Sequence, residues 1–235
     1  MMIRIGVPSK GRLMEKTFDW FAARGLHMRR NGAEREYAGV IEGANNAELV
    51  LLSAGEMPRE LAAGRVHLGV TGSDLVRETL PDWATQVAEV APLGFGFADL
   101  VIAVPNVWVD VETLDDLDAA AASFRARHGH RLRIATKYHR LTHAFLREND
   151  VADYQLVDSQ GATEGTVRNL TAEAIADITS SGETLTANHL KILQDGVIHR
   201  SQAVLFASHH PDLAADRGAL AALLADIGLG LPAAG

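Results

Sequence analysis

The chain contains no cysteine among its 235 residues. This absence excludes disulfides, cysteine nucleophiles and thiolate metal sites, and it removes the main sequence sign of an oxidising compartment. Cations are also scarce, because 22 Lys and Arg stand against 30 Asp and Glu, for a formal net charge of −8. Such an acidic chain lacks the broad basic surface of a nucleic-acid-binding protein. We therefore expect no nucleic-acid partner, although a local basic cluster can still bind a small anion.

Long apolar runs are missing as well. Runs such as 100–104 have the length of a strand, and none approaches a membrane span. The N-terminal residues show neither the apolar core nor the cleavage site of a secretory signal. We therefore expect a cytoplasmic protein that does not contact a membrane. Hydrophobic residues make up 47% of the chain, which is enough for a buried core and excludes a disordered or collagen-like chain.

Short apolar runs alternate with segments of helical periodicity. Several runs are apolar at nearly every position, as in parallel strands that are covered on both faces. The alternation predicts an α/β fold with right-handed crossovers. The expected strands are 3–7, 48–53, 67–70, 86–90, 100–104, 132–135, 154–157, 174–178 and 198–207. The expected helices are 12–23, 57–63, 75–79, 111–127, 141–149, 185–193 and 212–227.

Several common catalytic signatures are absent. The sequence has no P-loop lysine motif, no Gly-x-Ser-x-Gly elbow, no His-Glu-x-x-His and no complete Gly-x-Gly-x-x-Gly fingerprint. The adjacent pair His209 and His210 directly precedes an expected helix, which favours capping or solvent exposure over metal binding. We therefore expect no metal site built from side chains alone.

One segment has the composition of a phosphate-binding loop. An apolar strand brings Asp177 to its carboxyl end, and a short loop of small and polar residues leads into an expected helix. Backbone N–H groups, hydroxyls and the helix start can together bind phosphate, while the carboxylate accepts hydrogen bonds from sugar hydroxyls. The same pattern also fits an ordinary strand–turn–helix with Thr184 as N-cap. The loop residues are Thr179, Ser180, Ser181, Gly182, Glu183 and Thr184.

Other small-residue turns follow other expected strands. Lys10, Gly11 and Arg12 begin the first helix, where two cations oppose the helix dipole and so indicate an anionic ligand. Arg35 belongs to a basic cluster with Arg29 and Arg30 in this acidic chain, and surface solubility is the alternative explanation, above all for Arg29 and Arg30. Gly72 and Asp74 form one further turn, and Glu164 lies in another. Taken singly, each of these turns favours a structural role over a functional one, but together they can converge on a crevice between two α/β domains.

Five segments, in order along the chain, match motifs of one family. The first reads Ile5-Gly-Val-Pro-Ser-Lys-Gly-Arg-Leu13, and the most specific begins Glu173-Ala-Ile-Ala-Asp-Ile-Thr-Ser-Ser-Gly-Glu-Thr-Leu185 and runs on to Leu190. The remaining segments span 66–75, 134–138 and 161–164. They resemble the ATP phosphoribosyltransferase family, whose members catalyse the first step of histidine biosynthesis. The chain departs from the family pattern at three positions. The family usually has an acid where this chain has His67, aspartate where it has Glu173, and commonly proline where it has Val167.

The resemblance implies two α/β domains around a crevice, of the type II periplasmic-binding-protein kind. The first domain would comprise 1–95 with 186–235, and the second 96–185. The chain ends soon after its last expected helix, so it resembles the short form of the family, which lacks a histidine-binding C-terminal domain. Short-form members assemble with a regulatory subunit similar to histidyl-tRNA synthetase. A homodimer is expected for the chain on its own.

The resemblance also implies a reaction and roles for individual residues. ATP would attack 5-phosphoribosyl 1-diphosphate (PRPP) through adenine N1 to give N1-(5-phosphoribosyl)-ATP and diphosphate, with Mg²⁺ carried mainly by substrate phosphates. The catalytic cations would be Lys10, Arg12 and Arg35. The PRPP-binding residues would be Glu164, Asp177, Thr179, Ser180, Ser181, Gly182, Glu183 and Thr184. The ATP-binding residues would be Gly11, Gly72, Asp74 and Glu173.

Three other functions share parts of this pattern. A non-catalytic module that binds an anion or senses an effector would have the same fold, and fold alone does not determine function. A phosphoribosyltransferase that uses another nucleophile would have a similar PRPP loop but would not prefer ATP. A scaffold protein is the third alternative, but it would not explain the small residues that follow the expected strands.

Overall fold

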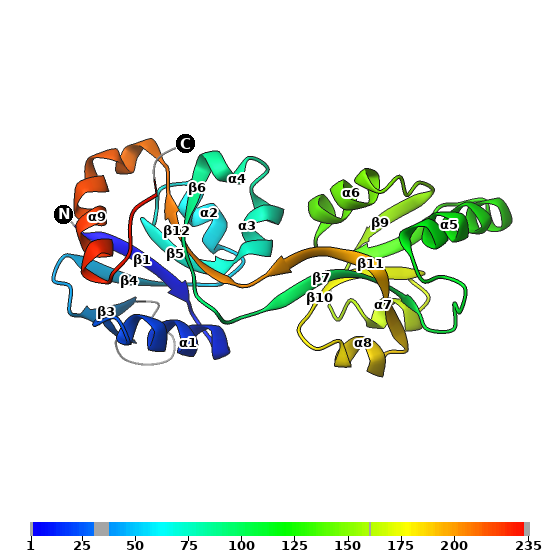
Figure 1. Ribbon diagram of the computed structural model, residues 1–235, viewed down its shortest axis with the longest axis horizontal. Coiled ribbons are helices and arrows are strands. Elements are labelled where there is room, and N and C mark those ends of the chain that lie inside the picture. Colours follow the sequence, from blue (N-terminus) through cyan, green and yellow to red (C-terminus); the bar gives the residue numbers. More distant parts are fainter. Residues whose placement is uncertain (1, 31–37, 160, 233–235) are drawn as a thin grey trace. The chain divides into compact units, whose positions relative to one another are not determined.

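The computed structural model describes residues 2–30, 38–159 and 161–232. The chain divides into two compact units, drawn with their elements in Figure 1. Unit 1 consists of Met1–Gly96 with Gln202–Gly235, and unit 2 of Phe97–Ser201. Each unit contains its own sheet with helices on both faces, so the expected α/β class is confirmed.

Unit 1 contains a seven-stranded mixed sheet in the order β2-β3-β4-β1-β5-β12-β6. Its centre is parallel, because β1 pairs with both β4 and β5, whereas β12 runs antiparallel between β5 and β6. The bounds are β1 Ile3–Pro8, β2 His27–Arg30, β3 Ala38–Glu42, β4 Ala47–Leu52, β5 Leu68–Gly72, β6 Val87–Pro92 and β12 Ala203–Ser208.

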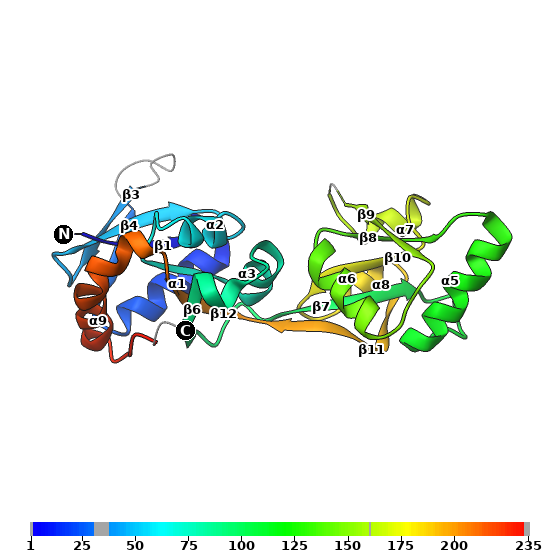
Figure 2. The ribbon, with the colours of Figure 1, turned by 90° about the horizontal axis from the view of Figure 1, so that it is seen from above.

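Helices cover both faces of this sheet (Figure 2). Helices α1 (Gly11–Ala22) and α9 (Arg217–Asp226) contribute to one buried cluster, and α2 (Met57–Ala62) and α3 (Ser73–Thr79) to the other. Strand β12 has an apolar residue at nearly every position because both faces of the sheet are covered. Its alternate residues belong to opposite clusters, and all six are buried. The short elements α4 (Trp83–Gln86) and η1 (Pro211–Asp216) complete the unit.

Two glycines allow α2 to approach the centre of this sheet closely. Gly6 of β1 and Gly69 of β5 are neighbours in register, and Met57 of α2 lies over both. A Cβ atom would stand 2.5 Å from the Met57 Sδ atom at Gly6 and 2.7 Å from it at Gly69. Both distances are far below van der Waals contact, so a larger side chain at either position would displace the Met57 side chain from its place over the sheet.

Unit 2 contains a five-stranded sheet in the order β11-β7-β10-β8-β9. Strand β10 pairs antiparallel with β7 and parallel with β8, so it lies at the centre. Helices α5 and α6 pack on one face, and α7 and α8 lie on the side of the other face. The strands are β7 Ala98–Pro105, β8 Leu132–Thr136, β9 Tyr154–Asp158, β10 Ala174–Thr179 and β11 Leu190–Ser201. The helices are α5 Leu114–His128, α6 His139–Glu148, α7 Gly165–Arg168 and α8 Glu183–Ala187.

The structure corrects four sequence-based expectations. The expected helix 185–193 is wrong, because α8 ends at Ala187 and β11 begins at Leu190. The expected strand 198–207 is two strands in two different sheets, β11 and β12. Strands β2 and β3 were not expected. Residues 186–201 belong to unit 2 instead of the first domain, since β11 pairs along its length with β7.

In the described part of the chain, no helix has the length and apolar character needed to cross a membrane.

The turn between β3 and β4 offers a test of the close backbone packing in unit 1. Gly43 has φ +103°, and a Cβ atom there would stand 2.3 Å from the Gly25 carbonyl oxygen. We expect Gly43→Ala to lower the free energy of unfolding by about 2 kcal/mol or more, because backbone strain and a backbone clash combine. Urea unfolding measures the change. Gly55→Ala is the control, since no atom lies within 4 Å of its Cβ position; equal effects of the two substitutions would contradict the packing described.

Candidate functional site

A pocket of about 350 Å³ opens in unit 2 beside the end of β10. It brings together six of the eight residues that the family resemblance assigned to PRPP binding. Three further residues complete the wall, and none of them carries a charge. The lining residues are Ala98, Glu164, Asp177, Ile178, Thr179, Ser180, Ser181, Thr184 and Leu185.

Strand alternation directs Asp177 to this pocket. Ala174 and Ala176 pack in the core beneath α5 and α6, whereas Ile175 packs with Leu185 of α8 on the other face. Asp177 therefore falls on the α8 face, at the point where the strand changes from buried to exposed residues. Its Oδ1 atom accepts a hydrogen bond from the Ile178 N–H at 2.9 Å, and this bond limits the orientation of the carboxylate.

The loop after β10 leaves several donors available. Gly182 has φ +76°, a left-handed conformation that glycine adopts without strain, and its N–H donates to Thr179 Oγ1 at 2.8 Å. In the described structure, the backbone N–H groups of Ser180, Ser181 and Thr184 donate no hydrogen bond to a protein group. These N–H groups, with the nearby hydroxyls, form a concave set of donors suited to an anion. Gly182 and Glu183 shape the loop but do not line the pocket.

Glu164 forms part of the pocket wall, and neighbouring motifs hold it there. The Lys137 Nζ atom donates to the Gly161 carbonyl at 2.6 Å, which ties the end of β8 to the turn that precedes Glu164. Ser159 Oγ donates to Thr163 Oγ1 at 2.9 Å, and Thr163 is completely buried. The segments 134–138 and 161–164 therefore meet, and these bonds fix the turn that carries Glu164. The sequence did not lead us to assign Lys137 this role, although Lys137 lies inside the matching segment 134–138.

The basic residues at the start of α1 lie in unit 1. Lys10 is the N-cap, Gly11 has φ +71°, and the first turn contains no acidic residue. Lys10 and Arg12 are exposed, and neither forms an ion pair with any other described residue. Two unneutralised cations at a helix start oppose the helix dipole, so the arrangement gains stability when an anion binds.

Gly72 and Asp74, also in unit 1, are less exposed than Lys10 and Arg12. Gly72 precedes α3, and Asp74 in its first turn is buried, with 6% of its surface exposed. Thr71 Oγ1 donates to the Ala54 carbonyl at 2.7 Å, which fixes the strand end just before this turn. Arg35 lies outside the described residues.

Glu173 is not brought to the pocket. It precedes β10, at the opposite end of the strand from Thr179, and its carboxylate receives hydrogen bonds from Arg133. The Arg133 backbone N–H also donates to Glu173 Oε2 at 2.8 Å. Burial raises the pKa of Glu173, but the hydrogen bonds from the Arg133 side chain and backbone outweigh burial and lower it. The pair joins β8 to β10, so its role in this structure is to hold the sheet together.

His67 is buried in unit 1. Its Nδ1 atom accepts the Arg4 backbone N–H at 3.0 Å, and its Nε2 atom lies 2.7 Å from Asp216 Oδ2. These contacts connect the residue just before β5 to β1 and to η1. At the start of η1, His210 accepts the Asp212 N–H, as expected for a capping residue. The described residues contain no group of three or more His, Cys, Asp and Glu side chains that could hold a metal ion.

Solved structures of similar fold are two-unit α/β proteins of the periplasmic-binding-protein kind. The alkanesulfonate-binding protein SsuA from Xanthomonas axonopodis has a TM-score of 0.53 at 14% identity, covering 96% of this chain and 71% of its own. The ATP phosphoribosyl transferase (HisG:HisZ) complex from Thermotoga maritima has a TM-score of 0.72 at 18% identity, covering 97% of each chain. At these identities the likeness establishes the fold, and the expected periplasmic-binding-protein-like class is confirmed.

Sequence comparison gives the family. The family model described as HisG: ATP phosphoribosyltransferase matches residues 53–227. An ATP phosphoribosyltransferase from Cereibacter sphaeroides is 74% identical over 234 residues, covering 100% of this chain and 99% of the relative. One from Rhodopseudomonas palustris is 52% identical over 212 residues, 90% of this chain but 65% of that longer relative. The chain belongs to the ATP phosphoribosyltransferase family, as the motif resemblance had indicated.

The Arg133–Glu173 pair predicts a pH-dependent stability. Because folding lowers the pKa of Glu173, its contribution is complete above the ordinary pKa of glutamate and is lost as the pH falls through the folded value. We expect Glu173→Gln to lower the free energy of unfolding by about 1–3 kcal/mol at neutral pH, and by less in acid. Urea unfolding across this range measures the change, with the exposed Glu148→Gln as control. A destabilisation that does not vary with pH would contradict this role.

Proposed function

We propose that this chain is the catalytic ATP phosphoribosyltransferase, which condenses ATP with PRPP to give N1-(5-phosphoribosyl)-ATP and diphosphate. This is the first step of histidine biosynthesis. The main support is the pocket at the end of β10, which joins Asp177, Glu164 and the 179–184 loop in a chain of this family.

The unit 2 pocket is the proposed site for the ribose 5-phosphate part of PRPP. The N–H groups of Ser180, Ser181 and Thr184 can donate to the 5-phosphate, with added donors from the hydroxyls. The Asp177 carboxylate accepts hydrogen bonds from the ribose hydroxyls, and its position on a central strand keeps it fixed. Because these groups are held before the substrate arrives, they can orient C1 of the ribose for attack.

The donor set also suits Mg²⁺ carried by substrate phosphates. Magnesium in phosphoryl-substrate sites is bound by one or two carboxylates together with phosphates and water. Glu164 and Asp177 both line the pocket and can contact the hydrated ion. Bound there, the ion would supply positive charge to the diphosphate leaving group.

The reaction requires little proton transfer from the protein. Adenine N1 is unprotonated at neutral pH and can attack C1 directly, so no general base is needed to begin. The chain's task is to position two polyanions and to stabilise the negative charge of the departing diphosphate. We assign that stabilisation to Lys10 and Arg12, whose charges are not neutralised by described protein groups, and to Arg35 by family resemblance.

The adenine nucleotide is assigned to unit 1. Gly11, which has open space at its Cβ position, permits the backbone to approach a ligand closely. Gly72 is the N-cap of α3, and Asp74 lies in the first turn of that helix. Glu173, expected from the resemblance to contact ATP, is occupied by Arg133, and we assign it the supporting role described above.

We also propose that the chain works with a regulatory subunit of the HisZ kind, similar to histidyl-tRNA synthetase. Support comes from the Thermotoga maritima structure, which is a HisG:HisZ complex and matches this chain over 97% of its length.

A non-catalytic anion-binding module is the second candidate function. Its support is the fold, which this chain shares with sulfonate-binding proteins. Mixing the purified chain with ATP, PRPP and Mg²⁺, with and without the HisZ-type subunit, separates the two functions because the product absorbs differently from ATP. Product formation supports the transferase. Tight PRPP binding without product under both conditions would instead identify a binding module.

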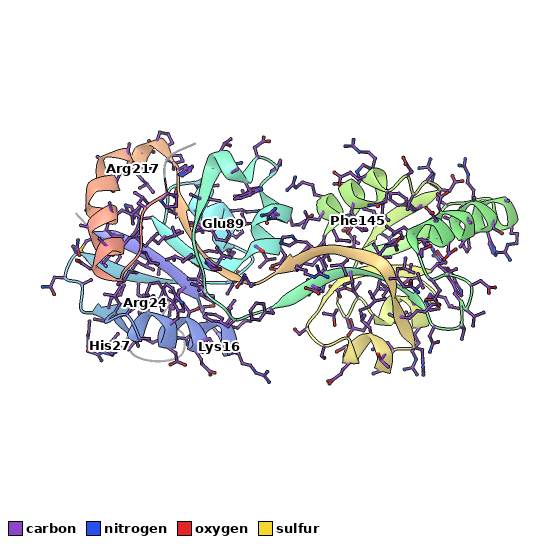
Figure 3. All side chains as sticks on the ribbon, in the orientation of Figure 1. Lys16, Arg24, His27, Glu89, Phe145 and Arg217 are labelled. Atoms are coloured by element: carbon purple, nitrogen blue, oxygen red, sulfur yellow. The ribbon has the colours of Figure 1, made fainter. Side chains whose placement is uncertain are left out.

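Arg12 provides a test of the role assigned to the cations at the start of α1. We expect Arg12→Ala to lower kcat by about 10²-fold, because a charge that stabilises the leaving group is lost, while the melting temperature changes little. Lys16→Ala is the control, since Lys16 is an exposed cation one turn further along α1 (Figure 3). Turnover and thermal unfolding are measured on both variants, and near-normal kcat in Arg12→Ala would refute the assigned role.

The pocket residues predict a separate loss of PRPP affinity. Asp177→Ala and Ser181→Ala each remove one hydrogen-bonding group, so we expect PRPP to bind about tenfold or more weakly in each. Calorimetric titration with PRPP and Mg²⁺ measures the affinity. Ser123→Ala on α5 is the control, since Ser123 does not line the pocket. Unchanged affinity in the two pocket variants would place the sugar phosphate elsewhere.

A further inference from the structure

One stretch of unit 2 concentrates positive charge in a chain that is acidic overall. Residues 124–147 contain seven Lys and Arg and four His, but no Asp or Glu. The stretch runs from the end of α5 through β8 to the last turn of α6. The function proposed above draws its cations from unit 1, so it leaves this concentration of charge unexplained.

Two of these cations, Arg131 and Arg147, have no partner among the described residues. Both side chains are exposed, and neither forms an ion pair or donates a hydrogen bond to another described group. Arg125, in contrast, pairs with Asp153. A guanidinium group presents its donors in a planar fork that matches the oxygens of a phosphate. Arg131 and Arg147 are therefore available to an anion from solution.

A groove of about 480 Å³ opens beside Arg131 and follows the start of β9. The His143 ring of α6 and the Tyr154 ring of β9 both line it, with ring centroids 6.3 Å apart and planes inclined by 60°. Each ring offers apolar surface together with a hydrogen-bonding group. The groove thus combines a free guanidinium with two aromatic side chains.

The charges of Arg131 and Arg147 both reach the Tyr154 hydroxyl. Burial raises the pKa of that hydroxyl, and the two positive charges partly oppose the rise. The hydroxyl is therefore protonated at neutral pH and can donate a hydrogen bond to a ligand. Arg147 does not line the groove, but its charge acts on a group bound beside Tyr154.

Asp153 is the acidic residue in the lining of this groove, and Arg125 neutralises it. The Arg125 Nη1 atom donates to Asp153 Oδ1, and the Asp153 side chain is 25% exposed. Because this pair has no net charge, Arg131 and Arg147 determine the sign of the charge in the groove. The groove is therefore cationic despite the carboxylate in its wall.

This groove is separate from the pocket proposed for PRPP. Leu132 and Tyr154 are paired at the amino ends of β8 and β9, beside the groove. The PRPP pocket lies at the carboxyl end of β10, which runs parallel to β8. The two sets of lining residues have no member in common. A ligand in the groove would occupy a second site at the opposite edge of the same sheet.

We propose that this groove binds an organic phosphate ester, with its phosphate on Arg131 and Arg147 and its organic part against Tyr154 and His143. A phosphate monoester has nearly two negative charges at neutral pH, which match two guanidinium groups. A carboxylate has only one charge to offer. The Tyr154 hydroxyl adds a neutral donor, and the two rings provide the apolar contact.

Tyr154 is also a specific reporter of this groove, because the sequence contains only three tyrosines. Tyrosine labelled with ¹³C at Cζ gives one NMR signal for each, and Tyr154→Phe identifies the signal of Tyr154. We expect phenyl phosphate to move this signal saturably, while the signal of the buried Tyr138 stays in place. Phenyl phosphate bound only in the PRPP pocket would not produce this movement. No saturable movement at millimolar phenyl phosphate would overturn the proposal.

Two further probes test the class of ligand. Inorganic phosphate lacks the ring and benzoate lacks the second charge, so we expect each to bind about threefold or more weakly than phenyl phosphate. Benzoate binding as tightly as phenyl phosphate would contradict the assignment to a phosphate. Inorganic phosphate binding as tightly would contradict the assignment to an organic ester.

Substitution of the two arginines tests the contacts. We expect Arg131→Gln and Arg147→Gln each to weaken phenyl phosphate binding by about tenfold or more, because each removes a charged donor. Arg168→Gln is the matched control, since Arg168 is an exposed arginine of α7 that does not line the groove. Equal losses in all three variants, or unchanged affinity in both groove variants, would overturn the proposal.

Asp153→Asn should have the opposite effect. The substitution removes the negative charge from the groove wall and frees Arg125, so we expect phenyl phosphate to bind about threefold more tightly. Asparagine also tolerates the left-handed backbone of this position, where φ is +43°. Asp226→Asn, an exposed change in unit 1, should leave the affinity unchanged. Weaker or unchanged binding in Asp153→Asn would contradict the charge argument. None of these measurements uses catalytic activity, so their outcome is separate from the proposed function.

Discussion

The pairing of β10 between β7 and β8 is the constraint on which the unit 2 pocket depends. Its first three residues are buried on both faces, so the strand cannot shift without breaking two clusters. Its last three residues emerge from that core and carry Asp177 and Thr179 to the pocket. A carboxylate and a donor-rich loop are thus attached to one of the most firmly held strands of the unit. The Arg133–Glu173 pair fixes the opposite end of the same strand.

The pocket also illustrates how one fold serves different chemistry. Sulfonate-binding proteins of the same architecture show that the fold suits the capture of anions. In this chain, the 179–182 loop supplies donors that suit a phosphate, and the neighbouring carboxylates supply oxygens that suit sugar hydroxyls. Family membership and this local chemistry agree, and neither depends on the fold alone.

The sequence predicted the local features of this site well. Strand periodicity placed Asp177 at the end of a buried strand, and turn composition identified the loop that follows. Motif resemblance added Glu164, which the structure brings to the same pocket. Glu173 was assigned an ATP contact, whereas in the structure its carboxylate pairs with Arg133. A side-chain pair 40 residues apart cannot be recognised from spacing alone.

The errors arose where distant pairing decides the local structure. Residues 185–193 have helical spacing, but His189 adopts φ +59° and the following residues pair with β7 almost 90 positions earlier. Because of that pairing, the C-terminal part of unit 1 begins at residue 202 instead of the expected residue 186. Strands β2 and β3 are short and carry charged or small residues, so their periodicity is weak. The pairing of β11 with β7 is non-local, so no short window of sequence contains both partners.

The central claim is that the pocket beside β10 holds the sugar phosphate of PRPP. A crystal structure of the chain with PRPP and Mg²⁺ tests it most directly. The account predicts that the 5-phosphate contacts the 179–184 loop and that the ribose hydroxyls contact Asp177. Density for PRPP at any other place, with this pocket holding only solvent, would contradict it.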